Sequence, residues 1–315
     1  MSSRVIRSAV IRSAVIRSAV IRGAVVRRAA LAGVAAFTVL TVASCADGDS
    51  GTESKGTTTV DASPQADAKD DAKAGEKDDA KAKEKKGGAH WGYEGADGPA
   101  NWATLAEDFE ACEAGKEQSP IDLDDDKAVE APVSKAITID YRPVTAELVN
   151  NGHTVQANVS EGSGIVIDGT SYDLKQFHFH LPSEHTEDGE HAEMEVHFVH
   201  ANQDGALAVV GVLMEARAGD SAFSDLFAKL PAEEGATERI TKSFDLTAFL
   251  PGDRDQYRYD GSLTTPPCAE GVKWTVLKEE VPVSPGEVAA YEELFPKSNR
   301  PTQPVNDREV TVVED

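Results

Sequence analysis

The chain contains 315 residues, of which 40% are hydrophobic and 27% charged, and its formal net charge is −24. A chain this acidic excludes nucleic acid and anionic lipid as partners held through a basic surface patch. Its three cysteines are too few for a disulfide-rich scaffold or a four-cysteine zinc site. The length fits one large domain or two ordinary ones.

Residues 1–45 have the pattern of an export signal, with seven arginines and no acidic residue. An apolar run of 15 residues, Ala29 to Ala43, suits a signal-peptide core and is short for a membrane-spanning helix. Cys45 follows the run directly after small residues, which resembles the bacterial lipobox, where the cysteine is lipidated and becomes the new N-terminus. We therefore predict an exported, extracytoplasmic protein anchored to the cell membrane through Cys45. The alternative is an ordinary cleaved signal, which would leave a secreted or periplasmic protein.

Residues 46–88 are composed almost entirely of small and charged residues, with eleven acidic residues and eight lysines. Val60 is the only aliphatic residue larger than alanine, and the segment has no aromatic residue. Such a composition cannot bury enough apolar surface to offset the loss of chain entropy on folding. We predict a disordered tether that holds a folded domain away from a surface.

Residues 89–315 carry a formal charge of −28 and are predicted to form the folded domain. An unbroken apolar run over 206–214 fits a strand buried on both faces, and helical patterns are confined to 221–230 and 285–295. The fold class we predict is mainly β (α+β), a single domain with a large central sheet and short peripheral helices. Alternation of apolar and polar residues, typical of strands, recurs between Asn-Gly and Asp-Gly turns in three segments: 136–141, 154–159 and 164–168.

Histidines are concentrated on two segments separated by an Asp-Gly turn, which predicts antiparallel neighbouring strands. Because side chains alternate across a strand, His178 and His180 share one face, and His197 can converge on them from the next strand. Three imidazoles and one open position are the ligand set of a catalytic zinc site. Gln176 and Glu195 precede His178 and His197 by two residues on the same face, so they are placed to orient the ligand rings.

Other interpretations of these histidines are weaker. A His-x-His pair followed by Glu184 is also part of the cupin metal motif, but no later segment supplies that motif's second half. The zinc β-lactamase pattern fails because no aspartate precedes His185. His200 has the wrong strand parity for the metal, so we expect His185 and His200 to be structural and His191 to be solvent-exposed.

Residues 90–308 resemble the α-class carbonic anhydrases, because a series of short motifs occurs in the order of that family. Any one of these motifs would be modest support, whereas so many in order are not a coincidence. The motifs are His90-Trp91-Gly92-Tyr93, Gln118 to Asp122, Asn150-Asn151-Gly152-His153, Gln176 to His185, Glu195 to His200, Leu207 to Gly211, Gly261 to Cys268, Trp274 and Asn299 to Pro304.

The resemblance implies a largely antiparallel, twisted sheet of about ten strands with Zn2+ at the base of a conical cleft. It implies that His178, His180 and His197 bind the zinc. Thr264 would accept a proton from zinc-bound hydroxide and donate its own to Glu184, which orients the nucleophile toward the substrate. His153 matches the proton shuttle. The matches to the apolar wall and the ordered water chain of the cleft are Val199, Val209, Leu263, Trp274, Tyr93, Asn151 and Thr265, with Gln156 in the same cleft by position.

The same resemblance implies a disulfide between Cys112 and Cys268, which suits an exported domain. It would close a long loop and brace the segment that carries Thr264. The predicted function is the reversible hydration of carbon dioxide to bicarbonate and a proton by a zinc lyase. The oligomeric state cannot be read from the sequence. A catalytically silent binding domain of the same fold is the alternative, which the intact histidines, Glu184 and Thr264 argue against.

Overall fold

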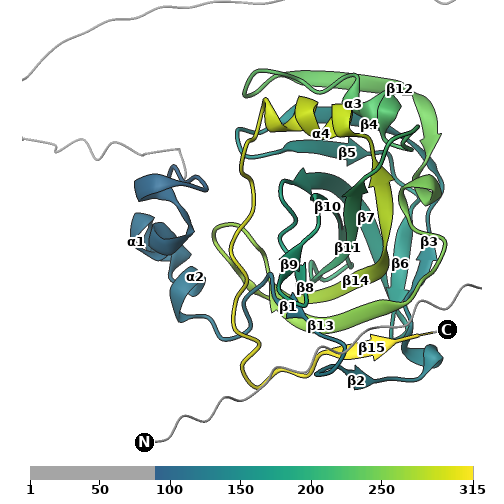
Figure 1. Ribbon diagram of the computed structural model, residues 1–315. Helices are drawn as coiled ribbons and strands as arrows, with labels where there is room; N and C mark the ends of the chain where they lie inside the picture. The colour runs from purple at the N-terminus through teal and green to yellow at the C-terminus, as the bar shows by residue number, and fades with distance from the viewer. Residues whose placement is uncertain (1–88, 315) are drawn as a thin grey trace, which may run out of the picture. The chain divides into compact units, whose positions relative to one another are not determined.

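The computed structural model describes residues 89–314 of the chain, most of which lie in strands and the loops between them (Figure 1). The predicted signal, Cys45 and the predicted tether fall outside the described residues. Among the described residues, no helix has the length and apolar character needed to cross a membrane. The mainly β class predicted from the sequence is confirmed.

A sheet of twelve strands forms the body of the domain, somewhat larger than the predicted ten. Its main path runs β12-β4-β5-β7-β10-β11-β14-β13-β15-β2, and β3 and β6 extend it beside β7. Pairs β11–β14 and β15–β2 are parallel and the other pairs of this sheet are antiparallel. The strands are β2 (Val129–Glu130), β3 (Thr138–Asp140), β4 (Pro143–Asn150), β5 (Val155–Val159), β6 (Gly164–Ile167), β7 (Thr170–His180), β10 (Met194–Ala201), β11 (Leu207–Ala216), β12 (Thr237–Asp245), β13 (Gln256–Ser262), β14 (Glu270–Val283) and β15 (Thr311–Val313).

A second, three-stranded sheet joins β1 (Asp122–Leu123), β8 (Thr186–Glu187) and β9 (Glu190–His191). Strands β8 and β9 form the hairpin between β7 and β10, so the chain makes a short excursion where the sequence predicted a simple turn. Strands β7 and β10 nevertheless pair antiparallel, as predicted.

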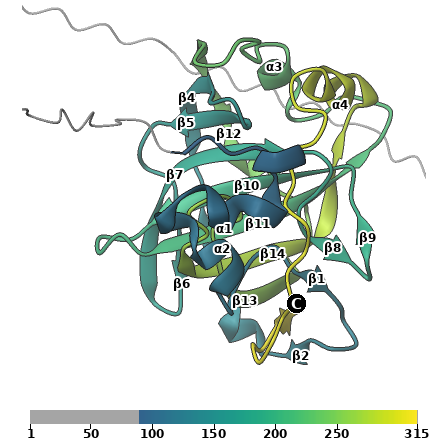
Figure 2. The same cartoon turned by 90° about the vertical axis from the view of Figure 1, so that its left-hand side faces the viewer.

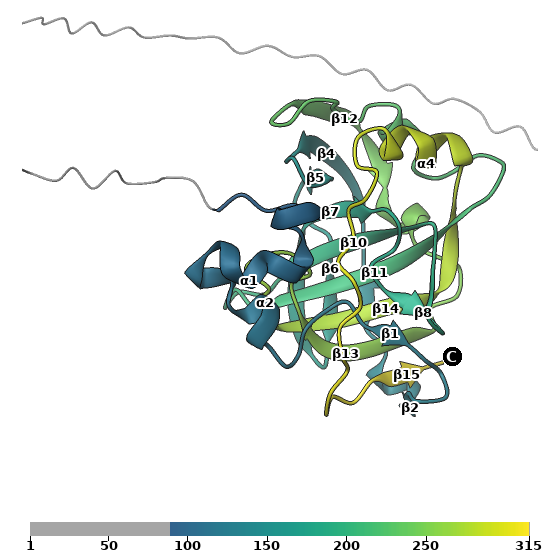
Figure 3. The same cartoon turned by 60° about the vertical axis from the view of Figure 1, so that its left-hand side comes forward.

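The predicted strands over 136–141, 154–159 and 164–168 correspond to β3, β5 and β6, each trimmed by one or more residues. All but the first residue of the apolar run over 206–214 lies in β11, most of which is buried. That burial arises because alternate residues of β11 enter two different hydrophobic clusters, one on each face of the strand. Within the sheet, β11 lies between β10 and β14 (Figure 3).

Helices are short and lie at the periphery. The helix predicted over 221–230 is reduced to α3 (Ser224–Phe227). The second predicted helix, α4 (Pro285–Glu292), begins where predicted. Ser284 and Glu287 form a capping box at its start, and a proline occupies its first position. Both helices lie at the β12-β4-β5 side of the sheet, and α1 (Trp102–Leu105) and α2 (Ala111–Ala114) lie apart from them (Figures 1 and 2). The remaining helical turns are 3-10: Gly95–Asp97, Pro99–Asn101, Glu107–Phe109, Val133–Lys135 and Leu246–Phe249.

The two faces of β7 and β10 have different chemistry because their side chains alternate. One face carries Phe177, Phe179 and Phe198, which are fully buried in the main core. Phe179 packs against Phe227 of α3 and Tyr291 of α4, so these helices seal that face. The opposite face carries His178, His180 and His197. The packing of the phenylalanines therefore fixes the direction in which the imidazoles point.

Candidate metal centre

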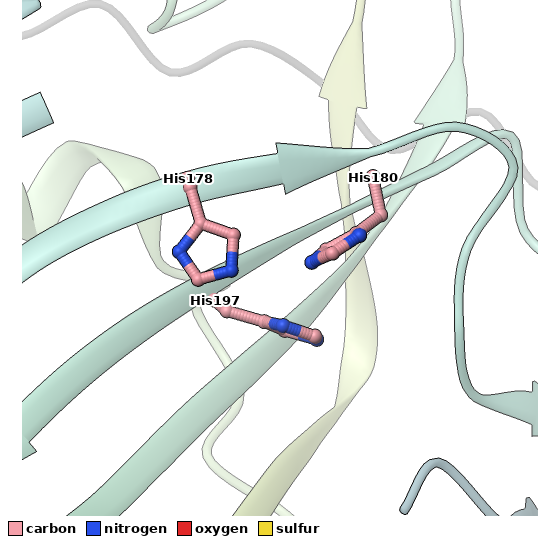
Figure 4. A group of neighbouring side chains, drawn as sticks. All are labelled: His178, His180 and His197. Carbon is pink, nitrogen blue, oxygen red and sulfur yellow. The ribbon is translucent and has the colours of Figure 1, made fainter. Parts of the chain in front are cut away.

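Three imidazoles converge from β7 and β10 at the centre of the sheet (Figure 4). His197 lies directly across from His178 in the register of the two strands, and His180 lies two residues further along β7. One nitrogen from each ring lies within 4.8 Å of one nitrogen from each of the others. The structure therefore brings together the three histidines that the sequence grouped.

The outward nitrogen of each ring is engaged by a fixed acceptor. Nδ1 of His178 lies 2.8 Å from the side-chain oxygen of Gln176, and Nε2 of His197 lies 2.8 Å from Oε1 of Glu195. These are the two orienting residues predicted from spacing. Nδ1 of His180 lies 2.5 Å from the backbone carbonyl of Ser298, a partner that the sequence analysis missed. The run from Asn299 was part of the family resemblance, but nothing in it pointed to a carbonyl one residue earlier.

The inward nitrogens fit a zinc ion. Nε2 of His180 is buried and has no hydrogen-bond partner, which is costly for a polar atom unless a ligand engages it. Burial lowers the pKa of His178 well below its ordinary value, that of His180 to about 4, and that of His197. Neutral rings with free inward lone pairs are the form that binds metal, and three nitrogens with an open position match catalytic zinc.

Glu195 connects His197 to the loop beneath the candidate site. Its Oε1 accepts from His197 and from Nδ1 of His185, and its Oε2 accepts from the backbone N–H groups of Glu184 and His185 at 2.9 and 2.8 Å. Burial raises the pKa of Glu195, but its electrostatic interactions and hydrogen bonds with His185 and His197 outweigh this and hold that pKa well below its ordinary value. A fully ionised carboxylate here can only accept, so each ring presents an N–H to it.

Glu184 lies under the inward nitrogens and is fully buried. Its Oε1 accepts from the backbone N–H of Arg300 at 2.8 Å, while Oε2 lies 3.5 Å from Nε2 of His180 and has no partner at hydrogen-bonding geometry. Burial raises the pKa of Glu184 to about 7, against the opposing effects of His197, the nearby Thr264 side chain and Arg300. The structure thus brings Thr264, itself 6% exposed, beside the carboxylate that the sequence paired with it.

A cavity of about 160 Å³ opens above the three imidazoles. One wall is apolar because Val199, Val209 and Trp274 sit directly across from one another on β10, β11 and β14. The polar wall includes Gln156, whose amide donates to Asn158 at 2.7 Å. Every predicted cleft residue lines this cavity: Tyr93, Asn151, His153, Gln156, Val199, Val209, Leu263, Thr264, Thr265 and Trp274, joined by Trp91 and Thr154, to which the sequence analysis gave no role in the cleft.

His153 lies at the cavity wall, in the loop that follows β4. Its ring stacks on Trp91, with ring centroids 3.7 Å apart and planes 8° apart. Partial burial and His90 lower its pKa, while Glu234 raises it. Trp91 belongs to the opening motif of the family resemblance, but its contact with His153, 62 positions later, could not be read from spacing.

The other histidines occupy the places predicted for them. His185 and His200 are fully buried and hydrogen-bonded, His185 to Glu195 and to the Tyr259 hydroxyl, and His200 to the Tyr141 hydroxyl at 2.9 Å. His191 is exposed. His185, Glu195 and His197 also lie close enough to suggest a metal group, but their atoms are already joined by the hydrogen bonds described above.

The predicted disulfide between Cys112 and Cys268 is present, with Cα atoms 5.0 Å apart. Cys268 also donates its backbone N–H to the carbonyl of Thr265, and the N–H of Leu263 bonds to the carbonyl of Ala269. The disulfide therefore attaches the short α1–α2 segment to the loop that carries Thr264.

Comparisons with known proteins agree with this geometry. Residues 97–314 match the family model described as eukaryotic-type carbonic anhydrase. A carbonic anhydrase of Pectobacterium atrosepticum is 39% identical over 220 residues, which cover 70% of this chain and 89% of that protein. The structure of an α-carbonic anhydrase from Thermovibrio ammonificans, in complex with the inhibitor sulfanilamide, superposes with a TM-score of 0.69 and 41% identity over 71% of this chain and all of that one. Dioscorin dioA3 of Dioscorea japonica is 38% identical over 221 residues, 68% of this chain and 82% of that protein. The chain therefore belongs to the α-class, or eukaryotic-type, carbonic anhydrase family.

Proposed function

We propose that this carbonic anhydrase carries out the reversible hydration of carbon dioxide with Zn2+ held by His178, His180 and His197, and with His153 as its proton shuttle. The observation that carries the proposal is the arrangement of three buried imidazoles with engaged outer nitrogens and convergent inner ones. Zinc bound there would lower the pKa of a coordinated water from about 15.7 to about 7, an effect for which carbonic anhydrase is itself the standard example.

The protein's own residues then have distinct tasks. The apolar wall of Val199, Val209, Leu263 and Trp274 receives carbon dioxide, which is apolar and needs no charged group to hold it. The hydroxyl of Thr264 lies beside the buried carboxylate of Glu184. There it orients the oxygen that attacks carbon dioxide toward the apolar wall.

Hydration releases one proton for each bicarbonate formed, and the proton must leave the cavity. Tyr93, Asn151, Gln156 and Thr265 line the polar side and provide partners for a chain of waters. His153 at the end of that side takes the proton, because an imidazole exchanges protons near neutral pH.

Zinc content and stopped-flow carbon dioxide hydration test the metal assignment together. His197→Ala should lose most of its bound zinc and its activity, because removal of one of three ligands leaves an incomplete site. His191→Ala, which changes an exposed histidine, is the matched control and should keep both. Full zinc content and activity in His197→Ala would overturn the assignment.

A second candidate is a binding domain that keeps the fold without catalysis. This candidate is supported by the similarity to dioscorins, one of which has a structure titled as a complex with ascorbate. The complete ligand set, Glu184 and Thr264 favour the enzyme. Zinc binding without hydration activity in the unmodified protein would favour the binding domain instead.

We also propose that the protein is exported and anchored through lipidated Cys45, with residues 46–88 as a disordered tether. The disulfide suits an oxidising compartment, and bacterial carbonic anhydrases are among the similar proteins. Mass spectrometry of the mature N-terminus checks the anchor, since a diacylglyceryl group on Cys45 has a defined mass. An unmodified N-terminus located elsewhere would leave the ordinary cleaved signal.

A further inference from the structure

A loop far along the chain is fastened beside the shuttle histidine. Asn150 at the end of β4 is buried, and its carbonyl accepts from the backbone N–H of Gly235 at 2.8 Å. Its side-chain amide donates to the carbonyl of Pro231 at 3.0 Å, and its side-chain oxygen accepts from the N–H of Gly152 at 3.0 Å. One buried asparagine therefore holds the residue before His153 and the loop 231–235 together.

This arrangement places the Glu234 carboxyl group against Gly152. A Cβ atom at Gly152 would lie 3.0 Å from Cδ and 3.1 Å from Oε1 of Glu234, and Gly152 also has a φ of +86°. Glycine is thus favoured here by its left-handed backbone conformation. The carboxyl group fills the room that a side chain at 152 would take, immediately next to His153.

In the described part of the chain, the titratable groups that act on His153 are His90 and Glu234. Burial of the ring and a positive charge on His90 both disfavour the protonated form of His153 and lower its pKa. Glu234 acts in the opposite direction. The stacking partner Trp91 is uncharged and fixes the ring without altering this balance.

We propose that Glu234 is a positioning residue for proton transfer, whose carboxylate, lying over Gly152, stabilises the protonated ring of His153 at the cavity wall. The proposal rests on the shuttle role of His153 given above. Glu234 touches neither the substrate nor the candidate metal, so it would act only through His153.

The proposal has a kinetic consequence. A proton acceptor that is less basic takes a proton more slowly. Loss of the Glu234 charge should therefore slow hydration at a pH above the pKa of His153, where the neutral ring accepts a proton from the cavity. Dehydration at the same pH should fall by the same factor, because fewer rings are then protonated and the ratio of the two rates is set by the overall equilibrium. Displacement of the ring would instead slow both directions without lowering the pKa of His153.

The experiment compares Glu234→Gln with Glu233→Gln in the full-length zinc-loaded protein. Glu233 is a neighbouring exposed acid, and its removal controls for net charge. NMR titration of the ring protons, with the His153 signal assigned from its absence in His153→Gln, measures the pKa directly. Initial rates of hydration and dehydration in weak buffer give kcat and kcat/KM.

We expect a lower pKa for His153 in Glu234→Gln and no change in Glu233→Gln. The hydration kcat should fall by about 1.5- to 5-fold, the range expected for a solvent-exposed charge pair, while kcat/KM is unchanged. Glu234→Asp should restore part of both effects. An equal His153 titration in Glu234→Gln and Glu233→Gln would overturn the proposal, and so would a fall in the hydration kcat without a lower pKa of His153.

Failure of this proposal can be distinguished from failure of the shuttle assignment. If His153→Ala loses no activity in weak buffer, the shuttle assignment fails, and with it the kinetic part of the proposal. The NMR titration still decides whether Glu234 sets the pKa of His153.

Discussion

Oε1 of Glu195 lies 2.8 Å from Nε2 of His197, and the same oxygen lies 2.7 Å from Nδ1 of His185. Because this carboxylate is ionised and can only accept, the proton of His197 is held on Nε2 and its Nδ1 lone pair is left for a metal. The pair thus selects the ring nitrogen that faces the other two ligands.

Glu195→Gln should weaken zinc binding by about 10- to 100-fold, the usual cost of removing a partner that orients a ligand. In the unmodified protein, each carboxylate oxygen of Glu195 accepts two hydrogen bonds from N–H groups. Either orientation of the glutamine amide therefore places its NH2 group opposite two N–H donors, which it cannot accept from. Competition with a chromophoric chelator measures the affinity. Glu193→Gln, an exposed neighbour, serves as the control, and equal affinities for the two variants would contradict the role of Glu195.

Thr264→Val should reduce kcat/KM for hydration by about 100-fold while the zinc content stays that of the unmodified protein. Valine keeps the shape of threonine but removes the hydroxyl that lies beside Glu184, and loss of one oriented group at a reacting centre costs about this much. Stopped-flow rates and metal analysis of the same sample check the two halves. A variant with normal kcat/KM would show that the hydroxyl orients nothing.

His153→Ala should lower kcat by roughly 10- to 100-fold in weak buffer, with kcat/KM unchanged, because proton release follows formation of bicarbonate. Added imidazole should restore the rate by carrying the proton in place of the missing side chain. The measurement is a buffer-concentration series at fixed pH. If the variant and the unmodified protein depend equally on buffer, His153 carries no proton.

Removal of the disulfide should lower the free energy of unfolding by about 2 to 5 kcal/mol, since its cysteines are 156 residues apart in sequence. Cys112→Ser combined with Cys268→Ser should also lower kcat/KM. The disulfide holds Cys268, whose backbone N–H bonds to the carbonyl of Thr265 in the loop of Thr264, so loss of the disulfide frees that loop. Urea unfolding and hydration rates test both effects. Cys45→Ser, which leaves the disulfide intact, should match the unmodified domain, and a double variant as stable as that control would refute the bracing role.

Acid should destabilise the domain in part through His200. Burial lowers the pKa of His200 to about 3 from an ordinary value of 6.5, so the unfolded chain binds a proton here between these values and the folded chain does not. The contribution of neutral His200 to the free energy of unfolding is therefore fully present above about pH 6.5. It is lost as pH falls below that value, by about 1.4 kcal/mol per pH unit.

His200→Gln should accordingly show a shallower fall in unfolding free energy between pH 6.5 and 4.5 than the unmodified protein, whatever its stability at neutral pH. Urea unfolding at several pH values gives the two slopes. Metal release at low pH affects both proteins alike, so the difference between slopes isolates His200. Identical slopes would mean that His200 is already accessible to protons in the folded state.

Much of the site could be predicted from local sequence because strands alternate side chains with a period of two. That period alone puts His178 and His180 on one face, sets Gln176 and Glu195 two residues before their rings, and excludes His200 from the metal. The apolar run over 206–214 likewise predicted a central strand. These features depend on neighbours within one or two strands.

The tertiary structure alone decided the contacts that cross the fold. The carbonyl of Ser298 engages His180 across 118 residues, Trp91 stacks on His153, and Glu234 packs on Gly152. Each of these partners lies in a loop or an irregular segment, where no periodicity links one residue to another. Their positions depend on how the whole chain packs around the sheet. The sequence by itself determined which residues could bind zinc, and the tertiary structure decided what holds those residues and His153 in place.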